Sequence, residues 1–140
     1  MYTRTFKFDD WNGNPREETW NFHLSDAELT EWELSTSGGL TNYIQQIQET
    51  QDVPKLIALY KELIMKTVGK KDADGRRFHK SEELTKEFME TGAYSELYME
   101  LATQADAGAK FINALISDKL RAAVEENGGL QNANHPALNK

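Results

Sequence analysis

The densest apolar pattern in the chain lies between Val53 and Val68. One row of apolar residues follows the i, i+1, i+4, i+8 spacing of a core-facing helix, and a second row lies beside it. The rows are Leu56, Ile57, Tyr60, Ile64 and Val68, and then Leu59, Leu63 and Met65. A surface helix needs only one such row, so we expect the central helix here. Asp52 is placed to cap it, with Pro54 in its first turn.

Alternating polar and apolar residues near the N-terminus predict two strands, over residues 2–8 and 18–24. The turn-rich segment DDWNGNP separates them, which indicates a β-hairpin over about residues 2–24. Phe6, Phe8, Trp20 and Phe22 would form its aromatic face. Two strands alone are marginal in water, so this face must cover something. We favour the chain's own helices, and the alternative is an edge open to strand addition from another molecule.

Local signals mark the helices on either side of the central one. Ser25 and Glu28 have the spacing of a capping box, and the breaker cluster at 35–39 ends the helix that they begin. The next helix would then run to about Gln51. Its apolar stripe predicts one buried face.

The second half of the chain predicts three further helices. Asp74 and Gly75 form a common turn pair, which indicates a second short hairpin or an exposed loop. Ser81 is placed to cap the helix that follows, and Gly92 is placed to stop it. The apolar row from Tyr94 predicts the next helix, and the last would run over about residues 106–125.

Taken together, these patterns predict a mainly α fold with five to six helices and an N-terminal β-hairpin. At 140 residues a single domain is the default, and we place it at residues 1–126. Residues 127–140 contain two adjacent glycines and little apolar content, so we expect a flexible tail.

Composition narrows the class of protein. The chain has no cysteine, which excludes disulfides and thiolate sites and suits a reducing compartment. It contains no stretch of about 20 apolar residues and no signal-peptide pattern, so we expect a soluble, intracellular protein without a membrane partner. The net charge of −7 argues against a nucleic-acid partner, because phosphate contacts need clustered basic residues.

The segment from Lys55 to Lys80 is nevertheless net positive. The interpretation that we favour is that its basic groups pair with acidic neighbours of the same fold. The alternative is a docking surface for an acidic partner.

Candidate chemistry is sparse. His79, Glu83 and Glu87 could share a helix face, and a metal-dependent hydrolase would need such a site. Carboxylates at this spacing are far more often solvated surface, and no second ligand pair supports the metal. Phosphate-binding and nucleophile motifs are also missing from the sequence. We expect no catalytic residues, no cofactor and no metal.

Two stretches carry a resemblance to a known family: Leu34 to Ile47, LSTSGGLTNYIQQI, and Lys80 to Ile116, KSEELTKEFMETGAYSELYMELATQADAGAKFINALI. With the opening hairpin and the FHLSDAELTEWEL segment, they resemble the tail assembly chaperones of long-tailed, siphovirus-type bacteriophages. The likeness is to a group from phages of Gram-positive hosts, and it covers the chain to about Ile116.

The resemblance implies a small helical protein without catalysis in the cytoplasm of the infected bacterial host. Such a chaperone binds the long, helical tape measure protein, helps the tail tube protein to polymerise around it, and is absent from the mature virion. The alternative is a virion structural component, such as a head–tail connector or a minor tail protein. A homo-oligomer is compatible with either.

Partner contacts are expected on the aromatic hairpin, on the basic segment and on the exposed parts of the last helices. The candidate residues are Trp11, Trp20, Lys70, Lys71, Arg76, Arg77, Tyr94 and Tyr98.

Overall fold

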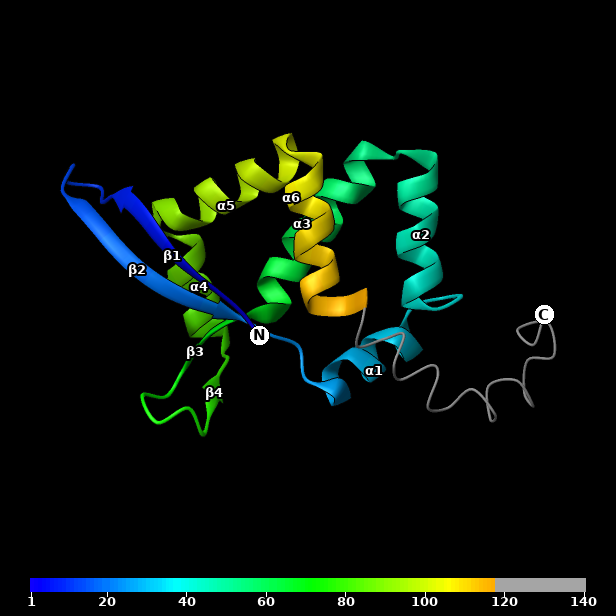
Figure 1. Ribbon diagram of the computed structural model, residues 1–140, viewed down its shortest axis with the longest axis horizontal. Coiled ribbons are helices and arrows are strands. Elements are labelled where there is room, and N and C mark those ends of the chain that lie inside the picture. The colour runs from blue at the N-terminus through cyan, green and yellow to red at the C-terminus, as the bar shows by residue number, and fades with distance from the viewer. Residues whose placement is uncertain (118–140) are drawn as a thin grey trace.

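The computed structural model describes residues 1–117 (Figure 1). Its strands are β1 (Tyr2–Asp9), β2 (Pro15–Phe22), β3 (Val68–Lys71) and β4 (Phe78–His79). Its helices are α1 (Asp26–Ser35), α2 (Leu40–Thr50), α3 (Val53–Thr67), α4 (Glu82–Met89), α5 (Gly92–Thr103) and α6 (Ala105–Ile112), followed by the π-helical turn η1 (Asn113–Ser117). The expected fold class, mainly helical with an N-terminal hairpin and a second short strand pair, is confirmed.

The hairpin forms the first two strands of a four-stranded sheet with the order β1-β2-β3-β4. β1 and β2 pair antiparallel over their whole length, from Tyr2 opposite Phe22 to Asp9 opposite Pro15. Phe6 and Phe22 are fully buried, and Phe8 packs at the edge of the core. The prediction that the aromatic face packs on the chain's own helices is therefore confirmed.

Phe88, near the end of α4, is the centre of this packing. Its ring centroid lies 5.7 Å from that of Phe6, 5.1 Å from that of Trp20 and 5.6 Å from that of Phe22. The Trp20 and Phe22 contacts are edge-to-face, the arrangement that the aromatic quadrupole favours. These contacts fix α4 against the face of the hairpin.

The central helix is also confirmed. α3 lies between α2 on one side and α4 and α5 on the other (Figure 1), and its buried residues are Leu59, Tyr60, Leu63, Ile64 and Thr67. One assignment was wrong: Met65, placed in the second apolar row, is 44% exposed. On the helix it lies beside Lys61 rather than with the buried residues, because successive residues turn by about 100°.

Three predicted helix starts have the expected caps. In the capping box of α1, the Glu28 amide donates to Ser25 Oγ at 3.1 Å and the Ser25 amide donates to Glu28 Oε1 at 2.9 Å. Asp52 accepts from the Lys55 amide at 3.2 Å, and Ser81 caps α4 in the same way. Such caps satisfy amides that have no partner within the helix.

Gly92 does not end α4. That helix stops at Met89, and Gly92 is the first residue of α5, whose cap is the Thr91 hydroxyl. Glycine suits this position because a Cβ would lie 3.3 Å from the Phe8 ring. The predicted end of the last helix near residue 125 and the tail at 127–140 lie outside the described residues.

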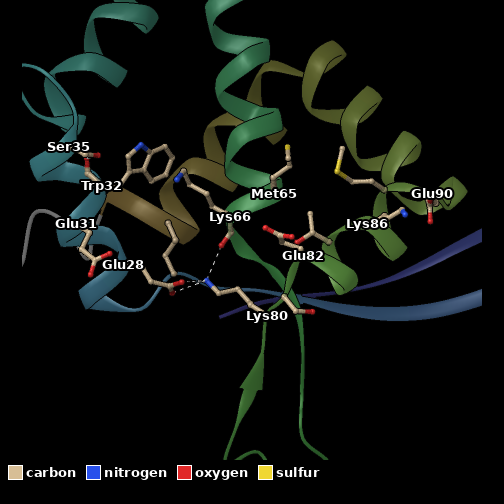
Figure 2. A pocket seen from close by; sticks show the side chains of 14 residues that line it. Glu28, Glu31, Trp32, Ser35, Met65, Lys66, Lys80, Glu82, Lys86 and Glu90 are labelled. Carbon is tan, nitrogen blue, oxygen red and sulfur yellow. Dashed lines mark hydrogen bonds and ion pairs between the residues drawn. The ribbon is translucent and has the colours of Figure 1, made fainter.

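Lys80 ties three segments together at one point. Its ammonium group pairs with Glu28 at 2.7 Å and donates to the carbonyl oxygens of His23 at 3.0 Å and Lys66 at 2.9 Å. The start of α1 and the end of α3 are thus held to the residue that leads into α4. These contacts are drawn in Figure 2 for the side chains that it shows.

Gly108 allows α6 to pack directly on α3. A Cβ at this position would lie 2.0 Å from Tyr60 Oη and 2.5 Å from Tyr60 Cζ. Glycine to alanine within a helix ordinarily stabilises by about 1 kcal/mol. Here we predict that Gly108→Ala destabilises the fold by about 1–3 kcal/mol in urea unfolding, because the core is overpacked. Tyr60→Phe in the same background should recover part of the loss, and stabilisation by Gly108→Ala alone would contradict this contact.

The Lys80 contacts also predict a pH dependence. Burial acts to raise the pKa of Glu28, but hydrogen bonds from Lys80 and Ser25 and the charge of Lys80 outweigh it, so the pKa lies below its ordinary 4.5. A depressed pKa contributes stability above the unfolded value, and that stability is lost as the pH falls through the folded value. Lys80→Met should therefore lower the unfolding free energy by about 2 kcal/mol at pH 7. The difference from the unmodified chain should narrow below pH 4.5.

The matched control is Lys61→Met, on the exposed side of α3. It should change stability by less than about 0.5 kcal/mol at either pH. An equal, pH-independent loss of unfolding free energy in both variants would contradict the role given to Glu28 and Lys80.

Candidate functional site

An open groove of about 990 Å³ lies between α1, the end of α3 and α4 (Figure 2). Its lining consists of an apolar floor and a rim of charged residues. The lining residues are Leu24, Glu28, Glu31, Trp32, Ser35, Met65, Lys66, Lys80, Ser81, Glu82, Thr85, Lys86, Met89 and Glu90. One wall belongs to α1 and the opposite wall to α4, and these are held in place by the capping box, Lys80 and Phe88.

Methionine and tryptophan form most of the apolar floor. Met65 is 44% exposed, whereas Trp32 is 8% exposed and packs into the core. Met89, at the end of α4, lines the opposite side. Methionine side chains are flexible and polarizable and adapt to differently shaped apolar partners. The floor can therefore take apolar side chains without a single fixed complementary shape.

The charged groups on the floor are engaged within the fold. Lys80 is held by Glu28 and two carbonyl groups, as described above. Lys66 lies over the Trp32 ring, with its ammonium group 5.0 Å from the ring centroid, and pairs with Glu62 at 3.9 Å. Both lysines already have a negative or aromatic partner.

The rim keeps unpaired carboxylates on both walls. No hydrogen bond or ion pair joins the side chains of Glu31, Glu82 or Glu90 to another residue in the described part of the chain. Lys86 is the lining cation without such a contact there. Since three free carboxylates face one free ammonium group, the open rim is net negative.

Within residues 1–117, no group of three or more His, Asp or Glu side chains could hold a metal ion. The His79 ring contacts Asp72, not Glu83 or Glu87. No helix in that part of the chain is long and apolar enough to cross a membrane.

The predicted contact residues of the hairpin have opposite surroundings. Trp11 is 83% exposed at the hairpin tip, and its indole Nε1 donates to the Glu90 carbonyl at 3.0 Å. This contact holds Trp11 beside Glu90, a residue of the groove rim, but Trp11 itself does not line the groove. Trp20 is fully buried against Phe88, so it offers no surface to a partner and its assignment as a contact residue is withdrawn. Strand alternation placed Trp20 on the apolar face correctly, but a buried face is not a binding face.

The four basic residues that were predicted to contact a partner do not line the groove. Lys70 extends over the Trp20 ring, 4.1 Å from its centroid, and donates to the Thr19 carbonyl. Lys71, Arg76 and Arg77 are exposed on β3 and the turn after it. In Figure 1 the strand pair β3 and β4 projects from the side of the molecule opposite to α5.

Tyr94 and Tyr98 belong to α5 and pack on each other, with ring centroids 5.8 Å apart. Tyr94 also contacts Phe88, and burial raises its pKa. The structure therefore does not join the tyrosines and the basic residues into one surface.

Sequence analysis missed the groove residues Glu31, Trp32, Met65 and Met89. A stricter helical projection of α3 could have found Met65, which falls outside the buried arc of the helix. The remaining residues come together only in the tertiary fold, which places α1 and α4 on opposite walls of the groove and for which the sequence carries no local signal.

Comparison with known proteins supplies the family. A family model described as phage tail assembly chaperone matches residues 1–139. No curated protein and no solved structure matches the chain. The matched range includes the hairpin, all the helices described above and the groove between them. Because the match spans almost the entire chain, the protein belongs to the phage tail assembly chaperone family.

Proposed function

We propose that this chaperone binds the tape measure protein of its phage and promotes polymerisation of the tail tube protein around it. The observation that carries the proposal is the open, methionine-containing groove in a chain of this family. Grooves with an apolar floor bind amphipathic helices by accepting side chains at i, i+3, i+4 and i+7.

The physical need for such a groove comes from the partner. A tape measure protein, as a long helical chain, would present apolar stripes before the tube surrounds it, and large exposed apolar surfaces aggregate. A domain that covers one stripe keeps the partner dispersed until the tube replaces it. The net charge of −7 supports the same role, because like charge keeps a concentrated assembly dispersed.

The proposed action is non-catalytic and transient. It takes place in the cytoplasm of the infected bacterial host, with the tape measure and tail tube proteins as partners and without nucleic acid. The chaperone is then absent from the mature virion.

Co-expression tests this proposal. The tagged full chain is expressed with the tape measure protein and, separately, with the tail tube protein of the same phage, and captured complexes are identified by mass spectrometry. We predict capture of the tape measure protein and absence of the chaperone from purified virions. A chain that captures neither partner, or one that persists in virions at stoichiometric amounts, would contradict the proposal. The second result would indicate a structural component such as a head–tail connector.

A further inference from the structure

We propose that the groove between α1, α3 and α4 accepts a basic amphipathic helix, one whose apolar stripe is flanked by lysine or arginine. The inference rests on the proposed function for the identity of the natural partner, and it adds the chemistry of the segment that is bound. The family description carries neither the groove nor the charge of its occupant.

The apolar stripe is required by the floor. Met65 is 44% exposed, and Met89 of α4 lines the same groove. Removing this apolar area from water favours a partner with large aliphatic or aromatic side chains. A purely polar ligand would offer no apolar side chains to pack against the floor.

The positive flanks are required by the rim. Glu31 lies on the α1 wall, and Glu82 and Glu90 lie on the α4 wall, one helical turn to either side of Lys86 (Figure 2). An acidic helix would bring like charges against both walls. A basic helix would instead place its cations beside carboxylates that lack a partner within the described residues. The complementarity therefore selects one sign of flanking charge.

Trp11 adds an exposed aromatic group next to the rim residue Glu90. Its indole group is held at the Glu90 carbonyl, and 83% of the side chain is exposed. An exposed indole beside an acidic rim can stack on an arginine or lysine of the partner. The surroundings of Glu90 thus favour the same positive charge on the partner.

Two synthetic helical peptides of about 18 residues test this chemistry on the full chain. They share one stripe of leucine and alanine and differ only in carrying lysine or glutamate at the flanking positions. We predict that the lysine peptide binds at least about tenfold more tightly at low ionic strength, and that added salt reduces the difference.

Groove variants assign the binding to this site. Met65→Gln should lower the affinity for the lysine peptide about fivefold. Its matched control is Met99→Gln, since Met99 is 52% exposed on α5. The double variant Glu31→Lys with Glu90→Lys should lower the affinity for the lysine peptide about tenfold. Glu17→Lys with Glu49→Lys makes the same change in net charge away from the groove and should have less than about a twofold effect.

Several results would overturn the inference. They are equal or tighter binding of the glutamate peptide, equal loss in groove and control variants, or self-association of the chain that Met65→Gln abolishes. The last result would make a second copy the occupant. Circular dichroism checks that each variant is folded. If Met65→Gln does not fold, the variant with Glu31→Lys and Glu90→Lys still tests the site.

The peptide experiment and the co-expression experiment fail separately. Groove-dependent binding of the lysine peptide, without capture of the tape measure protein, would keep the groove assignment and reject the proposed partner. Capture of the tape measure protein at equal strength by groove and control variants would keep the partner and reject the groove.

Discussion

The fold depends on burial of the aromatic face of the hairpin. A two-stranded hairpin is marginal in water, and this one gains its stability by packing Phe6, Trp20 and Phe22 around Phe88 of α4. Large-to-small substitution of a buried phenylalanine typically costs about 3–5 kcal/mol, a large part of a small domain's total stability. The aromatic cluster therefore sets both the existence of the sheet and the position of α4.

The groove follows from that position. Phe88 fixes one side of α4 to the sheet, which leaves Glu82, Met89 and Glu90 on the side that lines the groove opposite α1. Lys80 fixes the distance between the walls, because it joins Glu28 of α1 to the end of α3. The apolar floor stays open because α1 is held by the Glu28 to Lys80 pair and α4 is held by Phe88, not by contact with each other. A binding surface formed in this way needs no rearrangement of the core before a partner docks.

Local patterns predicted most of the fold. Alternation identified the hairpin, helical spacing identified α3, and the caps at Ser25, Asp52 and Ser81 follow from short-range hydrogen bonds. The site was not predicted, because it depends on long-range contacts such as the Lys80 to Glu28 pair. Periodicity separates apolar from polar faces, but it does not show which apolar residues a neighbour covers: Trp20 is covered and Met65 is not. The predicted contact residues therefore include the core residue Trp20 and omit Met65 on the floor of the groove.

The central claim is that the groove is the surface that a partner covers, and methionine oxidation tests it within one molecule. Met65 and Met99 are exposed to similar extents, 44% and 52%, on different helices. Dilute hydrogen peroxide converts exposed methionine to the sulfoxide, and peptide mass spectrometry measures each rate. With the tape measure protein bound, the account predicts slower oxidation at Met65 and an unchanged rate at Met99. Protection of Met99 with Met65 unprotected would contradict it.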